Sequence, residues 1–370
     1  MKTYAIILGT RPEAIKLAPV MLAMLARPKQ FRPMLWVSGQ HKELMHQALQ
    51  IFDLWPDVDL ELMQENQSQA NLIGSILQRI GSLIVKNKPD GIVVQGDTST
   101  ALAGALGGFF AGVPVIHVEA GLRTYDLSAP FPEEGNRQMI SRITRLHCAP
   151  TQRAYKQLLS EQIPPAHVVL TGNTVVDAIR WVAARNHSLP LLPFPVQGQR
   201  LVLTTLHRRE SFGATLEGML HAIRQLADRS ELGLVFIFPM HPNPNVRQQV
   251  ELILGGHPRI ALLEPLNYIE LAGVLAHCWL VLTDSGGLQE EAPSLAKPVL
   301  VLRDVTERPE GIETGAAELV GTEPSRLISA VERLHAEPNR YRRMTEAANP
   351  YGNGLAAEAI LNAIEHLDPR

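Results

Sequence analysis

Carboxylates gather in one short stretch of the sequence, HVEAGLRTYDLSAPFPEEGNR, which runs from residue 117 to residue 137. Its acids are Glu119, Asp126, Glu133 and Glu134. Glu119 directly follows the apolar run PVIHV, and Pro132 precedes a predicted helix that begins with Glu133 and carries Arg137. The positive end of a helix would attract one such glutamate. The helix end does not account for Glu119, which follows a predicted strand. We therefore interpret the stretch as a candidate for acid–base chemistry.

Other predicted strands of the first half also end in polar residues. Asp97 follows DGIVVQ, and Gln40 and His41 follow PMLWVS. A Gly-Thr-Arg turn with Arg11 follows YAIILG and leads into a helix that carries Lys16, an arrangement that can hold anionic oxygen. Helix capping by Asp97 and an ordinary loop at Arg11 remain open as alternatives. The turn is not G-x-G-x-x-G, which weakens the case for a bound dinucleotide.

The second half of the chain places histidine, arginine and glycine at its predicted strand ends. These residues are His207 with two arginines after it, His241 and Asn243 in HPNPN, Ser285, Gly286 and Gly287 in DSGG, and Arg308 in TERPE. The DSGG sequence opens a predicted helix, so its free backbone N–H groups form a second candidate for phosphate binding. A lone histidine is more often structural, but the two arginines favour a functional role for His207.

Apolar runs alternate with amphipathic stretches throughout the chain, which predicts parallel α/β construction. The predicted strands are 4–9, 33–38, 90–95, 113–118, 145–150, 167–172, 200–206, 233–239, 259–264, 279–284, 298–303 and 317–321. The predicted helices include 12–26, 71–87, 215–229, 245–254, 269–277 and 325–337. The Pro-rich segment 186–199 resembles a connector, so we expect two doubly wound domains. Ligands of such sheets bind beyond the carboxyl ends of the strands, where the polar residues lie.

Bulk properties narrow the function further. The length of 370 residues favours two domains, and a net charge of -3 gives no general attraction to nucleic acid or anionic membrane. The uncharged segment 98–116 is predicted to be a packed helix and a buried strand rather than a membrane span. Cys148 and Cys278 are expected to be core thiols of a reducing compartment, without a disulfide or a metal. The first apolar run stops at Gly9, so no export signal is expected, and the predicted location is cytoplasmic.

Ten motifs run in order along nearly the whole chain: GTRPEAIKLAP, GQHKELM, GDTST, HVEAGLRT, PEEGNR, TGNTVVDA, HRRESFG, HPNPNVR, LTDSGGLQEEAPSLAKPVLVLRDVTERPEG and NPYGNG. They resemble those of the non-hydrolysing UDP-N-acetylglucosamine 2-epimerases, bacterial enzymes that make UDP-N-acetylmannosamine for surface polysaccharides. The resemblance implies a GT-B-like fold of two Rossmann-like domains facing across a cleft. Residues 1–171 would carry the catalytic carboxylates and 172–370 would bind UDP, with a final helix at about 352–370 crossing back. It also implies a UDP-sugar substrate and a homodimer, with no cofactor and no nucleic-acid or membrane partner.

The resemblance also implies roles for individual residues. The acid–base carboxylates of the family correspond to Asp97, Glu119 and Glu133, and its other ligand contacts correspond to Arg11, Lys16, His207, Ser285, Gly286, Glu291 and Arg308. We place His207 with the catalytic group, and from the strand ends we add Gln40, His41, Arg137, His241, Asn243 and Gly287 as substrate contacts. Leu206 stands where the family usually has a small residue, which predicts a narrower floor of the cleft. The region of the family's allosteric site keeps Gln40 but differs at Glu43 and in the stretch 64–69, which has no basic residue.

The implied reaction inverts C2 of the sugar, whose hydrogen has no carbonyl beside it. Loss of UDP from C1 together with removal of the C2 proton would give a 2-acetamidoglucal, and return of UDP with protonation from the other face would complete the inversion. Neighbouring carboxylates should have raised, coupled pKa values. The sequence does not assign acid and base among them, and it predicts domain closure over the intermediate. A hydrolysing epimerase, an epimerase of a modified UDP-sugar, a GT-B glycosyltransferase and a non-catalytic sensor are the alternatives.

Overall fold

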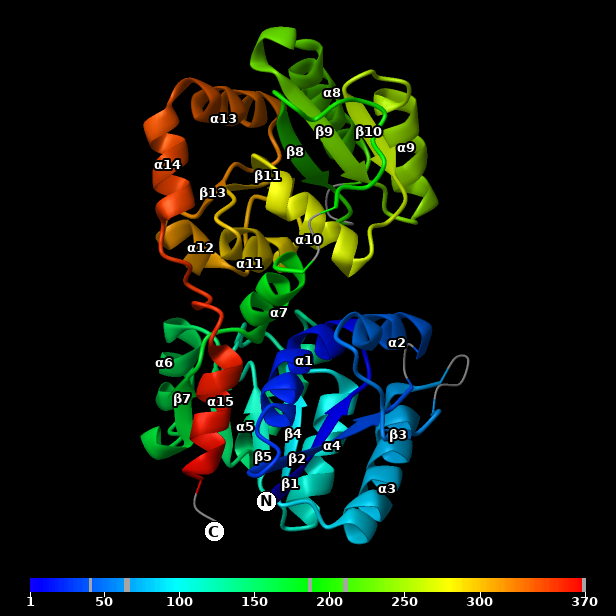
Figure 1. The fold of residues 1–370 in the computed structure, drawn as a ribbon, viewed down its shortest axis with the longest axis vertical. Coiled ribbons are helices and arrows are strands. Elements are labelled where there is room, and N and C mark those ends of the chain that lie inside the picture. Colours follow the sequence, from blue (N-terminus) through cyan, green and yellow to red (C-terminus); the bar gives the residue numbers. More distant parts are fainter. Residues whose placement is uncertain (40–41, 63–66, 186–187, 209–211, 368–370) are drawn as a thin grey trace. The chain divides into compact units, whose positions relative to one another are not determined.

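The computed structural model describes residues 1–39, 42–62, 67–185, 188–208 and 212–367 (Figure 1). The chain forms two compact units. The first contains Met1–Ala178 and Tyr351–Arg370, and the second contains Ile179–Pro350. The end of the chain therefore folds with the first unit, although the second unit precedes it in the sequence.

Among the described residues of the first unit, seven parallel strands form one sheet in the order β3-β2-β1-β4-β5-β6-β7. The strands are β1 (Lys2–Leu8), β2 (Phe31–Val37), β3 (Val58–Asp59), β4 (Gly91–Gln95), β5 (Val115–Val118), β6 (Leu146–Ala149) and β7 (Val168–Leu170). The helices are α1 (Arg11–Leu25), α2 (Lys42–Ile51), α3 (Gln69–Asn87), α4 (Ser99–Phe110), α5 (Glu133–Ile143), α6 (Gln152–Ser160), α7 (Thr174–Ala183) and α15 (Ala356–Glu365). The last residues of α7 already belong to the second unit.

Helices cover both faces of the first sheet, which explains why its strands are continuous apolar runs. Residues of α3, α4 and α5 form one core with Ile7, Trp36 and Val94 of the sheet. The uncharged segment 98–116 is α4 followed by β5, as predicted, and α4 is almost entirely buried. Within the described ranges, no helix has the length and hydropathy needed to span a membrane.

The second unit has the same construction. In its described part, six parallel strands form a sheet in the order β10-β9-β8-β11-β12-β13. The strands are β8 (Arg200–Thr205), β9 (Leu234–Pro239), β10 (Ile260–Leu263), β11 (Leu280–Thr283), β12 (Val299–Val301) and β13 (Ala317–Leu319). The helices are α8 (Ala214–Asp228), α9 (Pro244–Leu254), α10 (Tyr268–His277), α11 (Gly286–Ser294), α12 (Pro309–Glu313), α13 (Pro324–Ala336) and α14 (Pro338–Glu346). Residues of α8, α9 and α13 form a core against one face of this sheet.

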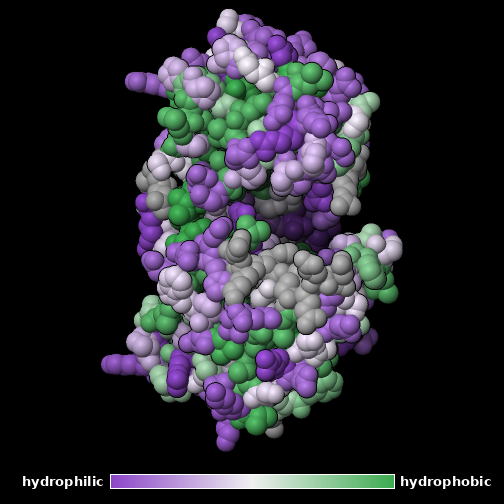
Figure 2. Space-filling model, turned by 90° about the vertical axis from the view of Figure 1, so that its right-hand side faces the viewer, coloured by the Kyte–Doolittle hydropathy of each residue, from purple (hydrophilic) through white to green (hydrophobic). Residues whose placement is uncertain are grey.

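Both units are therefore Rossmann-like, and every predicted strand and helix is confirmed within a few residues of its ends. The prediction did not name β3, α2, α6, α7, α12 or α14. Hydrophilic and hydrophobic residues are interspersed over the surface of each unit in Figure 2, as in most folded proteins.

Each sheet has a point at which the strand order reverses, and ligands of open α/β sheets bind beyond the strand ends at this point. In the first sheet the reversal lies between β1 and β4, and in the second it lies between β8 and β11. The loops that begin at Gly9 and Gly96 follow the first pair of strands. Those that begin at Leu206 and Asp284 follow the second pair. The predicted site residues are concentrated in or beside these four loops.

Candidate functional site

Glu119 lies at the carboxyl end of β5 and is almost completely buried. Its carboxylate receives Lys16 Nζ at 2.6 and 2.7 Å, the Asn173 side-chain amide at 3.3 Å and the side-chain amide of Gln95. Its backbone has a φ of 62°, in the left-handed region that a residue with a side chain seldom adopts. Such strain persists only where the surrounding structure enforces it, and it is concentrated at functional sites. Glu119 is thus a carboxylate held in place by hydrogen bonds from protein groups, and it faces a lysine.

Asp97 lies in the loop after β4 and is exposed over 26% of its side chain. Its pKa is raised to about 6, chiefly by burial. Within this net shift the charges of Arg137 and Lys16 lower the pKa, and those of Glu119 and Glu133 raise it. Arg137 on α5 contacts its carboxylate at 3.1 Å. Asp97 is therefore a carboxyl group that exchanges its proton close to neutral pH, with two other carboxylates nearby.

The loop that carries Asp97 is held from several sides. The buried ring of His117 donates its Nε2–H to the carbonyl of Gly96 at 2.7 Å, and burial lowers the pKa of this histidine to about 3, so the ring is neutral. Asn136 on α5 donates to the carbonyl of Asp97 at 2.8 Å. Thr98 caps α4 by accepting the N–H of Ala101 at 3.0 Å. The capping role that the sequence left open for Asp97 thus belongs to the next residue, and the Asp97 carboxylate contacts Arg137 instead.

The two glutamates that begin α5 have different environments. Glu134 is fully buried, and although burial raises its pKa, hydrogen bonds from Gln138, Thr124 and Tyr125 lower it overall. It therefore anchors the preceding loop. Glu133 is partly exposed, and its charge acts on Asp97. Of this pair, Glu133 is the more accessible, and its role as an acid–base group stays a prediction.

Arg11 is the first residue of α1 and is partly exposed beside this loop-bearing edge of the sheet. Gln40 and His41, which were predicted to contact the substrate, lie outside the described residues, as does the side chain of Glu43. The first unit therefore brings together Lys16, Asp97, Glu119, Glu133 and Arg137, all of which the sequence singled out.

In the second unit, His207 lies at the end of β8 with its Nδ1 3.0 Å from the carboxylate of Asp284. Asp284 is completely buried at the end of β11 and also accepts the backbone N–H groups of His207 and Arg208 at 2.7 and 2.8 Å. Burial raises its pKa, but these contacts outweigh the effect and lower it overall. The ring of His207 stacks on that of His241, with centroids 5.5 Å apart. The contact with Asp284 thus restrains the ring of His207 and favours a proton on Nδ1, the nitrogen that faces the carboxylate.

The beginning of α11 lies next to this histidine. Gly286 and Gly287 form its first turn, and a Cβ placed on Gly286 would lie 3.8 Å from the guanidinium of Arg208. In the part of the chain that the structure describes, the Ser285 hydroxyl does not cap the helix. Backbone N–H groups, an arginine and a hydroxyl therefore meet at a helix start, which is suited to a phosphate group.

Other residues of the second unit that were predicted to contact the substrate form contacts within the unit. Asn243 caps α9 by accepting the N–H of Asn245 at 3.0 Å. Arg308 pairs with the buried carboxylate of Glu290, and Glu291 is itself buried in α11. Leu206 is buried in the core of the unit, and its effect on the floor of a binding cleft stays a prediction.

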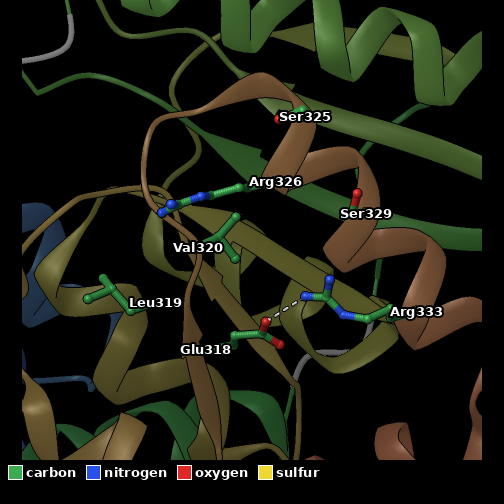
Figure 3. A pocket seen from close by; sticks show the side chains of 7 residues that line it. All are labelled: Glu318, Leu319, Val320, Ser325, Arg326, Ser329 and Arg333. Carbon is green, nitrogen blue, oxygen red and sulfur yellow. Dashed lines mark hydrogen bonds and ion pairs between the residues drawn. The ribbon is translucent and has the colours of Figure 1, made fainter.

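The pocket in Figure 3 lies elsewhere in the second unit, between β13 and α13. Glu318 in this pocket pairs with Arg333 at 2.9 Å, and Arg326 extends across Val320. It contains none of the predicted site residues. Among the described residues, no group of three or more His, Cys, Asp or Glu side chains is placed to hold a metal ion.

Several residues of the two clusters were not predicted. They are Gln95 and Asn173, which bind Glu119, His117 and Asn136, which hold the Asp97 loop, and Asp284 and Arg208 beside His207. Gln95 and Asp284 lie at the ends of predicted strands where the strand order reverses. Their positions could therefore have identified them as site residues. Asn173 lies 54 positions from Glu119, and no local pattern marks this pairing.

The chain was compared with known proteins. Residues 23–365 match a family model described as UDP-N-acetylglucosamine 2-epimerase. The sequence is 42% identical to the UDP-N-acetylglucosamine 2-epimerase of Escherichia coli (strain K12), over 97% of each chain. It is also 42% identical to that of Bacillus subtilis (strain 168), over 97% of this chain and 93% of that protein. A crystal structure of the UDP-GlcNAc 2-epimerase from Neisseria meningitidis bound to UDP-GlcNAc superposes with a TM-score of 0.88 at 38% identity, covering 98% of this chain and 99% of that one.

Proposed function

The chain belongs to the UDP-N-acetylglucosamine 2-epimerase family, and from this premise we propose that it interconverts UDP-N-acetylglucosamine and UDP-N-acetylmannosamine. The observation that carries the proposal is the convergence of Asp97, Glu119 and Glu133 with Lys16 and Arg137 at one edge of the first sheet. A C2 inversion needs proton transfer on both faces of the sugar and negative charge near C1, and this cluster contains suitable groups for both.

In the proposed reaction the C2 proton passes to a carboxylate as the C1–O bond breaks. The electrons of the C2–H bond form the C1=C2 double bond of a 2-acetamidoglucal, and UDP leaves with the electron pair of the C1–O bond. UDP then adds back to C1 while C2 accepts a proton from the opposite face. Atoms and charge balance without an oxidant, so the reaction requires no redox cofactor.

The environments of the three carboxylates suggest different roles. Asp97, with a pKa of about 6, is suited to moving a proton near neutral pH. Glu119 is held by Lys16, Gln95 and Asn173, so it is suited to act as a fixed negative charge beside the developing positive charge at C1. Glu133, partly exposed at the start of α5, is the candidate for proton transfer on the other face.

The second unit would bind the departing UDP. The N–H groups at the start of α11, the Ser285 hydroxyl and the Arg208 guanidinium can receive a diphosphate, and His207, whose Nδ1 faces Asp284, can donate from Nε2 when its ring is doubly protonated. Stabilising the anion as it leaves lowers the barrier to C1–O cleavage, because these donors are already oriented before the reaction begins.

Incubation of the purified protein with UDP-N-acetylglucosamine in deuterated water tests the proposal. The expected product is UDP-N-acetylmannosamine with deuterium at C2, detected by NMR and mass spectrometry. Conversion without deuterium at C2 would contradict the proton-transfer mechanism. Release of UDP with free N-acetylmannosamine would identify a hydrolysing enzyme instead, and the absence of any conversion would exclude the activity.

A further inference from the structure

Glu13, at the third position of α1, is 1% exposed and lies between two of the loops described above. One carboxylate oxygen accepts the N–H of Gly9 at 3.0 Å, the N–H of Thr10 at 2.8 Å and the hydroxyl of Thr10 at 2.7 Å. The other oxygen accepts the hydroxyl of Thr98 at 2.6 Å. Burial raises the pKa of Glu13, and these four hydrogen bonds act in the opposite direction.

Helix capping accounts for only part of this arrangement. A glutamate at the third helical position commonly reaches back to the N–H of the capping residue, which here is Thr10. The contact with Thr98, 85 positions away, has no place in such a cap. Thr98 follows Asp97 directly, and Thr10 precedes Arg11 directly. One carboxylate therefore joins the loop that leads to Arg11 with the loop that carries Asp97.

The two loops are also packed closely beneath this carboxylate. A Cβ on Gly9 would lie 2.3 Å from both Ser38 Oγ and Thr100 Oγ1, which are themselves 2.9 Å apart. Glycine is thus required for the approach of β1 to α4. The segment that follows β1 therefore lies tightly against the first turn of α4, and the Glu13 carboxylate ties the same segment to Thr98 in the Asp97 loop.

We infer that Glu13 is a positioning residue, which sets the separation between the Arg11 loop and the Asp97 loop through its bridge to Thr98. The inference rests on the proposed function, in which Asp97 transfers a proton at C2. A shift of the Asp97 carboxylate by a fraction of an ångström would slow this step, while the contacts that bind UDP in the second unit would be unchanged.

The test breaks the bridge from the side of Thr98. Thr98→Val removes the hydroxyl, and we expect kcat to fall about tenfold or more with KM for UDP-N-acetylglucosamine changed by less than about threefold. Thr98→Ser keeps the hydroxyl and should restore kcat to within about threefold of the wild type. Thr151→Val is the matched control, because Thr151 caps α6 in the same unit and its replacement also removes a capping hydroxyl.

The bridge also predicts how two substitutions combine. Glu13→Asp lacks one methylene and cannot reach both loops, so it should lower kcat on its own. The double variant Glu13→Asp/Thr98→Val should have a kcat within about threefold of the slower single variant. Each substitution alone already breaks the same contact. Multiplicative effects of the two substitutions would overturn the inference. So would wild-type kcat in folded Thr98→Val, or an equal loss of kcat in the Thr151→Val control.

Amide hydrogen exchange separates the inference from the proposed activity. Thr98→Val should speed exchange at the N–H groups of Gly9 and Thr10, in the other loop, relative to Thr98→Ser. Unchanged exchange at these amides would overturn the bridge whatever the activity. A wild-type protein that fails to convert UDP-N-acetylglucosamine would contradict the proposed function, while faster exchange in the variant would still establish the bridge.

Discussion

Lys16 Nζ lies 2.6 and 2.7 Å from the two carboxylate oxygens of Glu119, and both side chains are largely buried. A buried carboxylate that loses its cation is left with an uncompensated charge. We expect Lys16→Met to lower the free energy of unfolding by about 3 kcal/mol, since breaking a buried pair from one side is strongly destabilising. Urea denaturation at pH 7 measures this loss. The slope of the unfolding free energy against urea concentration should be compared between variants.

The double variant Lys16→Met/Glu119→Gln is the control for this prediction. Glutamine removes the charge, and its one carbonyl oxygen can still accept from Gln95, although its NH₂ group cannot accept from Asn173, so part of the lost stability should return. A double variant that is less stable than Lys16→Met alone would show that the pair does not behave as a buried ion pair. Neither variant should retain turnover, because Glu119 would be displaced or neutralised.

The sequence predicted most of the fold because both sheets are covered on two faces and their strands are therefore continuous apolar runs. It did not predict β3, which consists only of Val58 and Asp59 and is too short to show a pattern. It also did not predict α14, whose sequence PNRYRRMTE has a single fully buried side chain, Met344, and so lacks a clear apolar stripe.

The sequence predicted those site residues that lie at the ends of strands. Asp97 follows β4 after one glycine and Glu119 follows β5 directly, and parallel strands bring their carboxyl ends to one edge. The partners that hold these acids were not predictable in this way. Lys16 binds Glu119 across 103 positions and Glu13 binds Thr98 across 85, so the pairings depend on how helices pack against the sheet.

Asp97→Asn should make the protein more stable above pH 6. The pKa of Asp97 is raised from 3.8 to about 6 in the folded state, chiefly by burial, so folding favours the protonated form. The ionised form therefore costs stability above pH 6, and this cost disappears as the pH falls toward 4. We expect a gain of about 2 kcal/mol at pH 8 and no gain at pH 4, after allowing for the exposed part of the side chain. Urea denaturation across this range tests it.

The pH dependence distinguishes this prediction from a general effect of the substitution. A gain that is equal at pH 4 and pH 8 would show that the charge of Asp97 is not its source. A loss of stability at pH 8 would show that the contact with Arg137, at 3.1 Å, outweighs the burial of the carboxylate. In either case the variant should lose turnover if Asp97 transfers the proton.

Gly9→Ala should destabilise the first unit, because its Cβ would lie 2.3 Å from two hydroxyl oxygens that already contact each other. We expect a loss of about 2 kcal/mol, typical of overpacking in a close-packed region. Gly74→Ala is the matched control, since Gly74 lies in α3 with no atom within 4 Å of the added carbon. Alanine there should raise stability by up to about 1 kcal/mol through its better helix propensity. Equal effects of the two substitutions would contradict the close approach at Gly9.

Asp284→Asn should change the tautomer of His207. The carboxylate accepts two backbone N–H groups on Oδ2 and faces His207 Nδ1 with Oδ1 at 3.0 Å. Asparagine can keep the backbone contacts only by turning its NH₂ group toward Nδ1, which must then accept a hydrogen bond instead of donating one. The ring proton moves to Nε2, and the charge that stabilises a protonated ring is lost. We expect kcat to fall by about a hundredfold, comparable to the loss of one well-placed electrostatic contact.

Nitrogen NMR of the labelled ring reports this change directly, because protonated and unprotonated ring nitrogens have well separated shifts. The spectrum of the wild type should show a protonated Nδ1 at His207, and that of Asp284→Asn an unprotonated one. His241→Gln provides the comparison, since it removes the stacked ring while leaving the contact between Asp284 and His207 in place. An unchanged tautomer in Asp284→Asn, or a changed one in His241→Gln, would mean that Asp284 does not orient His207, and the role given to this histidine in holding UDP would lose its structural basis.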